Sequence, residues 1–311
     1  MNRMWNMIIK TRQERLEITI LRSLNARMGL SDKDVTNYLI LKKGFEGEQK
    51  SDVWLEGLSE GWLVIHDLLL EYNYNKFQID TLLISQNKIY PLDIKYFEGD
   101  YYVEGDKWYT SIKKEIKNPL HQLSRFEMML RSLLDDLGYR YPLESYLIFN
   151  NPDFHLYLTT VNTSMIFPTQ LNRFLKKLNA KPRKLNKGHL KLAEQLVSLH
   201  LVDPPYPRLP AYGYGHLVKG ILCPQCYSFF TDFLGGLLVC NSCGCKEEVE
   251  SAVLRSVAEL QLLFPDQKIT TKVVHEWCRI IKSEKTIRRI LGKNYKRIGS
   301  SISSNYVPRN D

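Results

Sequence analysis

Residues 77–95 read FQIDTLLISQNKIYPLDIK, which predicts two short apolar strands joined by a turn at residues 85–88. Asp80 lies in the first strand, and Asp93 and Lys95 lie at the end of the second. Because residues two apart in a strand point to the same face, Asp93 and Lys95 share a face. If the strands pair, Asp80 lies beside them, so two carboxylates and an ammonium converge on an otherwise apolar sheet. Unpaired charges are costly there, and a bound divalent cation would compensate them.

Four short motifs, two of them inside this stretch, follow one another within residues 40–130. They are GFEGE at 44–48, QID at 78–80, DIK at 93–95 and NPLHQ at 118–122. Their order and spacing resemble the PD-(D/E)xK nuclease superfamily and, more closely, its nuclease-related domain family, NERD. The chain departs from the family at one position, because Asp93 stands where the family more often has Glu.

The resemblance implies a restriction-endonuclease-like α/β fold, in which helices flank a mixed sheet, and metal-dependent hydrolysis of nucleic-acid phosphodiester bonds. It implies Asp80 and Asp93 as ligands of Mg²⁺ or Mn²⁺, with Glu48 as a supporting ligand directly or through water. Lys95 is expected to orient the attacking water or neutralise the phosphate, and Gln122 to position substrate or a metal-bound water. Plainer alternatives are a helix N-terminal acid at Glu48, a surface side chain at Gln122 and a structural Asp80–Lys95 salt bridge.

Helical spacing predicts a helix over residues 13–30 and a second from Ser31, which Gly44 ends. A third helix then places Glu48 in its first turn, where the helix dipole favours a carboxylate. Four consecutive strands between residues 62 and 109 are expected to form an antiparallel meander. Further elements are predicted as a helix from Asn118 to Gly138, strands at 146–149 and 155–158, and helices at 168–179 and 188–200.

Six cysteines all lie beyond residue 222, which is not the distribution of a secreted disulfide framework. CPQC is followed by thirteen residues and then CNSCGC, and paired C-x₂-C turns suit a tetrahedral thiolate site for structural Zn²⁺. The segment resembles a zinc ribbon. The expected ligands are Cys223, Cys226, Cys240 and Cys243, with Cys245 as an alternative to Cys243. Redox-active dithiols are the competing interpretation.

The net charge of +9 is concentrated near the end, where residues 251–311 hold 12 Lys and Arg against 5 Asp and Glu. This concentration fits a polyanionic partner. Helices expected at 249–263, 270–281 and 283–292 resemble a helix-turn-helix in their last two members. The candidate nucleic-acid-binding residues are Lys285, Arg288, Arg289, Lys293, Lys296 and Arg297. A basic helix pair packed on the ribbon is the alternative.

Five segments are expected along the chain. They are an N-terminal helical segment (1–40), a nuclease-related domain (41–202), a Pro-rich linker (203–216), a zinc ribbon (217–248) and a basic helical module (249–311).

Hydrophobic content of 44% and charged content of 25% are typical of a soluble globular protein. No uninterrupted apolar run approaches the roughly 20 residues that span a bilayer, and the N-terminal apolar stretch is too short for a signal peptide. A cytoplasmic protein without a membrane partner is therefore expected. The sequence favours a metal-dependent nuclease acting on nucleic acid, DNA rather than RNA. The alternatives are a non-catalytic DNA-binding protein on a nuclease-like scaffold, and a ribbon and tail that bind protein.

Overall fold

The computed structural model describes residues 7–157, 162–181, 184–201, 209–299 and 304–309. The chain forms two compact units. The first comprises Met1–Glu14 and Ile40–Pro204, and the second comprises Arg15–Leu39 and Pro205–Asp311. Residues 1–40, expected as one helical segment, are therefore divided between the units. Residues 202–208, which hold most of the expected linker's prolines, lie outside the described residues.

The first unit is built on a six-stranded sheet of order β1-β2-β3-β4-β8-β10. Its strands are β1 (Met7–Lys10), β2 (Leu63–Tyr72), β3 (Asn75–Ile84), β4 (Ile89–Lys95), β8 (Tyr146–Phe149) and β10 (Met165–Ile166). Strands β2, β3 and β4 are antiparallel as predicted, whereas β1, β8 and β10 add parallel pairs. The sheet is therefore mixed, and β1 is a strand that sequence reasoning missed.

The predicted meander does not continue past β4. The next strands form a separate four-stranded sheet, β7-β6-β5-β9, of β5 (Gly99–Glu104), β6 (Lys107–Thr110), β7 (Glu115–Ile116) and β9 (Phe154–Tyr157). Aromatic packing accounts for this change, because Phe97 stacks on Tyr101 and both contact Phe154 on β9.

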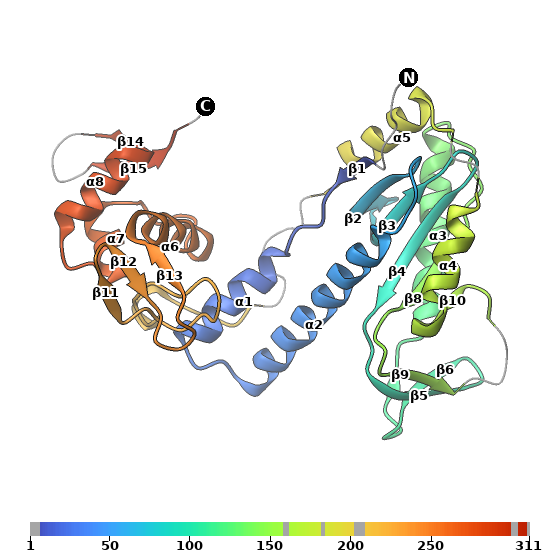
Figure 1. The fold of residues 1–311 in the computed structure, drawn as a ribbon, viewed down its shortest axis with the longest axis horizontal. Coiled ribbons are helices and arrows are strands. Elements are labelled where there is room, and N and C mark those ends of the chain that lie inside the picture. The colour runs from blue at the N-terminus through green and yellow to red at the C-terminus, as the bar shows by residue number, and fades with distance from the viewer. Residues whose placement is uncertain (1–6, 158–161, 182–183, 202–208, 300–303, 310–311) are drawn as a thin grey trace. The chain divides into compact units, whose positions relative to one another are not determined.

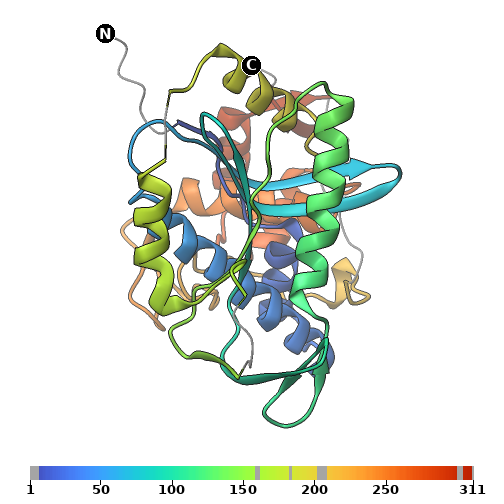
Figure 2. The ribbon, with the colours of Figure 1, turned by 90° about the vertical axis from the view of Figure 1, so that its right-hand side faces the viewer.

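Helices cover both faces of the main sheet. One face packs against α3 (Pro119–Asp136) and α5 (Lys187–Ser198). The other packs against the end of α2 (Asp32–Leu55) and against α4 (Leu171–Asn179), which follows the short η1 turn (Pro168–Gln170). Figure 2 looks along the sheet, with α3 in green on one side and α4 in yellow-green on the other. The predicted α/β sheet flanked by helices is confirmed. No helix among the described residues is both long and apolar enough to cross a membrane.

Helix α2 runs without a break over Asp32–Leu55, so the expected stop at Gly44 is wrong. Glu48 consequently lies deep in the helix rather than in a first turn. The two glycines differ in role, because a Cβ at Gly44 would meet nothing, whereas a Cβ at Gly47 would lie 2.3 Å from the Tyr96 Cβ. The Asn150 side chain also donates to the Gly47 carbonyl at 2.6 Å. Gly47 therefore lets α2 approach the end of β4 closely. The packing gained there outweighs the cost of about 1 kcal/mol of a glycine inside a helix.

The second unit contains α1 (Leu16–Arg27), a three-stranded sheet and three packed helices. Its other elements are η2 (Tyr214–His216), β11 (Asp232–Leu234), β12 (Leu237–Val239), β13 (Lys246–Glu248), α6 (Val249–Leu263), α7 (Thr271–Cys278), α8 (Glu284–Asn294), β14 (Tyr295–Ile298) and β15 (Asn305–Pro308). Buried Arg27 links α1 to α6 and α7, because its guanidinium pairs with Glu259 at 2.6 Å and lies 4.0 Å from the Trp277 ring centroid.

The end of the chain differs from the prediction in two ways. Helix α8 continues past Gly292 to Asn294, so this glycine does not cap it. Lys296 and Arg297, candidate nucleic-acid-binding residues in the predicted basic helical module, lie instead on strand β14, which pairs with β15. Backbone pairing with β15 satisfies donors and acceptors that another helical turn would otherwise satisfy.

Glu144 joins β4, β8 and α4 through a cluster of hydrogen bonds. Its carboxylate accepts from the Tyr146 hydroxyl and from the ammonium groups of Lys88 (3.0 Å) and Lys177 (3.3 Å). Although burial acts in the opposite direction, these bonds lower the pKa of Glu144 to about 2. The ionised carboxylate therefore stabilises the fold at neutral pH.

We predict that Glu144→Gln lowers the free energy of unfolding at pH 7 by about 1–3 kcal/mol, because the bonds to a charged acceptor are weakened. A carboxyl with a lowered pKa stabilises the fold above its ordinary pKa and loses that contribution as the pH falls towards 2. The difference from the wild type should therefore shrink below about pH 4.5. Urea unfolding at several pH values measures it, with exposed Glu194→Gln as the control. A deficit that persists at pH 2 would contradict the charge-based account.

Candidate active site and metal centre

The main sheet forks where β3 and β4 part. Their pairing ends at Thr81 opposite Leu92; beyond it β3 stays paired with β2, and β4 pairs with β8. The same register continued by one residue places Asp80 opposite Asp93. Across the fork, the Asp80 Oδ2 atom accepts the backbone N–H of Ile94 at 2.7 Å. The Asp80 carboxylate is thereby held against the end of β4.

Asp93 is a buried carboxylate, 2% exposed, with one engaged oxygen. Its Oδ1 atom accepts from Lys95 Nζ at 2.8 Å, and its Oδ2 atom has no hydrogen-bond partner among the described residues. Burial raises the pKa of Asp93 to about 7; the Lys95 ammonium opposes the shift and the Asp80 carboxylate adds to it. An unpartnered buried oxygen on a half-compensated carboxylate is a position that a cation would satisfy.

Lys95 links the two carboxylates to helix α3. Its ammonium donates to Asp93 and lies 3.4 Å from the Gln122 Oε1 atom. Burial acts to lower the pKa of Lys95, but the charges of Asp93, Asp80 and Glu48 outweigh it and the pKa is raised. The side chain therefore stays an ammonium at neutral pH, suited to electrostatic work and not to accepting a proton.

Gln122 reaches the site from the first turns of α3. Asn118 caps this helix by accepting the Leu120 N–H at 2.9 Å, and Pro119 occupies its first position, as the sequence predicts. Gln122 is exposed, and its long contact with Lys95 is its only hydrogen bond among the described residues. It is therefore available to a ligand.

Glu48 lies on the α2 side of the sheet and is 9% exposed. Its Oε2 atom accepts from the Arg12 Nη1 atom at 2.7 Å, while its charge still acts on Lys95. Glu48 is thus near the site but already paired with a cation of the protein.

Arg12 is a central residue that sequence reasoning missed. Its guanidinium, 3% exposed, donates to both oxygens of Asp52 at 2.8 and 3.0 Å and to the Asp80 carbonyl at 2.8 Å. It also donates to the Thr81 hydroxyl at 3.1 Å. The sequence did contain one indication of a shared cationic partner, because Glu48 and Asp52 are four residues apart and lie on the same helix face. Nothing in the sequence indicated that their partner lies at residue 12.

The network continues from Asp52 to His66 on β2. The His66 Nδ1 atom lies 3.1 Å from Asp52 Oδ1 and 3.1 Å from the Thr81 hydroxyl oxygen. Arg12 and His66 together lower the pKa of Asp52 against the opposing effect of burial. Glu48, Asp52 and the backbone at Asp80 are therefore positioned as one group.

The carboxylates fit a hard divalent cation with few protein ligands. Among the described residues, only four cysteines bring three or more ligating atoms within 4.8 Å of one another, so Glu48, Asp80 and Asp93 do not form a closed cage. Mg²⁺ commonly binds through one or two carboxylates and keeps several waters. The free Oδ2 atom of Asp93 and the adjacent Asp80 match that requirement, whereas Glu48 is held by Arg12.

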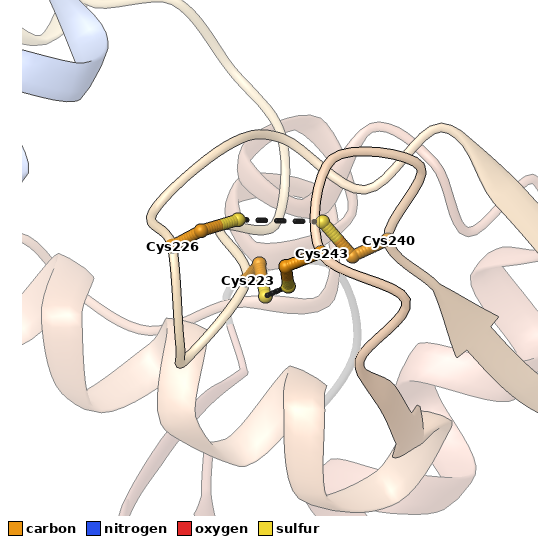
Figure 3. A group of neighbouring side chains, drawn as sticks. All are labelled: Cys223, Cys226, Cys240 and Cys243. Atoms are coloured by element: carbon orange, nitrogen blue, oxygen red, sulfur yellow. Dashed lines mark hydrogen bonds between the residues drawn. The ribbon is translucent and has the colours of Figure 1, made fainter.

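The predicted cysteine site is assembled in the second unit (Figure 3). The sulfurs of Cys223 and Cys243 are 3.6 Å apart, those of Cys226 and Cys240 are 3.4 Å apart, and all four lie within 4.8 Å of one another. The backbone N–H of Ser228 leads the effects that lower the pKa of Cys226 to about 6. Four converging sulfurs from two tight turns are a donor set that can hold zinc.

The remaining two cysteines do not belong to the four-sulfur cluster, although Cys245 lies next to it and its carbonyl accepts the Cys240 N–H at 2.9 Å. Cys245, the alternative fourth ligand, is not among the four clustered sulfurs, and its sulfur lies 4.0 Å from the Lys246 carbonyl. Cys278 is buried in the second unit, where burial raises the pKa of its thiol to about 12. Such a thiol is a core group and not a nucleophile.

Comparison with protein families identifies residues 43–150 as matching the nuclease-related domain, NERD. No curated protein and no solved structure matches the chain. The matched segment contains Glu48, Asp80, Asp93, Lys95 and Gln122, whereas Arg12 lies before it. The predicted resemblance is confirmed over this segment.

We predict that Arg12→Ala lowers the free energy of unfolding by about 3 kcal/mol, because it leaves buried carboxylates without their cation. Arg131→Ala, which removes an exposed ion pair with Glu127 on α3, should cost less than about 1 kcal/mol. Urea unfolding compares the two. Equal small effects would show that Arg12 does not hold Glu48 and Asp52 in place.

We predict one Zn²⁺ per chain, measured by elemental mass spectrometry. Cys226→Ser and Cys243→Ser should each abolish zinc retention and unfold the ribbon, because binding contributes about 10–16 kcal/mol in such modules. Cys245→Ser should retain zinc. Retention by Cys243→Ser with loss in Cys245→Ser would move the fourth ligand to Cys245.

Proposed function

We propose, from the premise that residues 43–150 are a nuclease-related domain, that the protein is a metal-dependent nuclease that hydrolyses nucleic-acid phosphodiester bonds. One observation carries the proposal. Within this segment the fork of the sheet brings Asp80, buried Asp93 with an unpartnered oxygen, and the Lys95 ammonium together. The two carboxylates can hold a metal ion, and the ammonium, protonated at neutral pH, can hold a phosphate beside it.

Asp80 and Asp93 would hold Mg²⁺ or Mn²⁺, which when bound polarises a phosphate oxygen and lowers the pKa of a bound water. Glu48, paired with Arg12, would support the site from the α2 side through water. Arg12 orients Glu48 and Asp52 and fixes the backbone at Asp80.

Lys95 would neutralise charge that develops on the phosphate, because its raised pKa keeps it protonated. Its contact with Asp93 also fixes which oxygen of that carboxylate stays free. Gln122, exposed and 3.4 Å from Lys95, would hold the substrate or an ordered water beside the ammonium.

The second unit would bind nucleic acid, DNA in preference to RNA. Exposed Lys285, Arg288 and Arg289 lie on α8, whose opposite face buries Ile287 and Ile290. Three further basic residues contribute differently: Lys293 pairs with Glu250 at 2.8 Å, and Lys296 and Arg297 are exposed on β14. Phosphate contacts from such residues give salt-sensitive affinity. The zinc ribbon packs into the same hydrophobic core as α8 and would hold that surface in shape.

Cleavage of plasmid, linear and single-stranded DNA and of RNA, with Mg²⁺ or Mn²⁺, tests the proposal. We expect Asp80→Asn and Lys95→Met each to lower the rate by about a hundredfold or more, since each removes charge at the reacting phosphate. Asparagine keeps an acceptor for the Ile94 N–H and so preserves the fork. Asp100→Asn and Lys191→Met, exposed in the same unit, are the matched controls.

Two results would contradict the proposal. Nicking that survives in both Asp80→Asn and Lys95→Met would place the activity elsewhere or in a contaminant. A band shift without cleavage under either metal would instead favour a non-catalytic DNA-binding protein on a nuclease-like scaffold.

A further inference from the structure

A groove of about 730 Å³ opens in the first unit between the start of β3, the β6–β7 hairpin and the first half of α3. Its volume is that of a ligand-sized pocket. Its polar lining includes Lys76, Gln78, Lys117, His121, Gln122 and Arg125. None of the sequence motifs predicted a groove here.

The groove runs into the candidate active site at two points. Gln122 lines it and lies 3.4 Å from Lys95 through its Oε1 atom. Gln78 lines it as well and stands two residues before Asp80 on β3. A chain lying in the groove would therefore lead directly to the carboxylates.

The acidic residues of the groove are already paired. Glu115 accepts from Lys107 at 3.1 Å, and Asp106 lies 2.7 Å from His121 and accepts from the Asn118 side chain at 2.9 Å. The charge of Glu115 is thus offset by Lys107, and the Asp106 carboxylate is engaged by hydrogen-bonding side chains of the same wall.

Four Lys and Arg side chains and two acidic residues line the groove, and three of these four cations form no ion pair among the described residues. Lys76 and Lys117 are exposed and have no ion-pair partner within 4 Å among the described residues. Arg125, also exposed, only approaches the neutral Asn75 side chain, at 3.5 Å. The groove therefore presents positive charge that an anionic ligand would neutralise.

The groove offers little on which a base could stack. Its two phenyl rings, Phe77 and Phe126, are 5% and 2% exposed and belong to the hydrophobic core beneath. The His121 imidazole is exposed, but it is held 2.7 Å from Asp106. Proteins that bind unpaired bases use successive exposed aromatic rings for that purpose. With one imidazole and no exposed phenyl, phenol or indole ring among the described lining residues, the groove suits phosphates better than bases.

We propose that this groove binds the phosphodiester backbone of the nucleic-acid strand adjoining the phosphate at the active site, without reading base sequence. The proposal rests on the proposed function, because it assigns the groove to the same substrate. Lys76, Lys117 and Arg125 contact successive phosphates, and Gln78 and Gln122 guide the strand towards Asp80 and Lys95.

The test uses full-length Asp80→Asn protein without divalent cations, so binding is measured apart from turnover. The probes are two 12-base-pair DNA duplexes of unrelated sequence. We expect the slope of log affinity against log salt to fall by about two in Lys76→Gln/Lys117→Gln, since two phosphate contacts are lost. Lys187→Gln/Lys191→Gln, exposed on α5, should leave the slope unchanged. A slope change is informative even if the second unit dominates affinity.

Lysine acetylation read by mass spectrometry locates the contact. Either duplex should slow modification of Lys76 and Lys117 equally, with Lys191 unaffected. The groove proposal would be overturned if a bound duplex left the acetylation rates of Lys76 and Lys117 unchanged. It would also be overturned if both double variants changed the salt slope equally. Protection by only one duplex would overturn recognition without base reading. If the duplex protects Lys76 and Lys117 from acetylation but the wild type cleaves nothing with any metal, the nuclease proposal is wrong and the groove proposal stands.

Discussion

The hydrogen bond from the Ile94 N–H to the Asp80 carboxylate is the interaction on which the first unit's site depends. Where two strands part, backbone donors and acceptors lose their partners, and buried ones must find others. Asp80 provides such a partner with a side chain. The same bond brings a carboxylate to the end of β4, where Asp93 and Lys95 already share a face. One hydrogen bond therefore both satisfies the backbone where the strands part and places the Asp80 carboxylate in the candidate site.

Charge balance around the fork is arranged in two parts. On the α2 side, Arg12 satisfies Glu48 and Asp52 almost completely. On the α3 side, Lys95 satisfies only one oxygen of Asp93. A buried charge left half-compensated is unfavourable for folding, and proteins retain such groups where a ligand completes them. This asymmetry supports the proposed active site on the α3 side, where the basic groove also opens.

The second unit is stabilised by different means. Its three-residue strands bury little apolar surface of their own, so the ribbon depends on the four convergent thiols and on the hydrophobic core that it shares with α6, α7 and α8. The buried Arg27–Glu259 pair adds a polar link within the same unit. Helix α8 is amphipathic. Its apolar face buries Ile287, Ile290 and Leu291 in the core, and its other face exposes Arg288 and Arg289. The hairpin of β14 and β15 then carries further basic residues beyond the helix.

The sequence by itself determined what depends on local spacing. The sequence predicted the strands from the apolar runs of β3 and β4, the cap from the Asn118–Pro119 helix start, and the cysteine cluster from the paired C-x₂-C turns. Each of these follows from residues close together in the chain. Only the tertiary structure decided what depends on distant partners. Helix α2 continues through Gly44 and packs at Gly47 against Tyr96 from the end of β4, and Arg12 reaches the site because β1 joins the sheet beside β2. The groove likewise needs β3, a hairpin and α3 together. Local propensity is weak beside such contacts, and no short pattern of residues records which segments fold against one another.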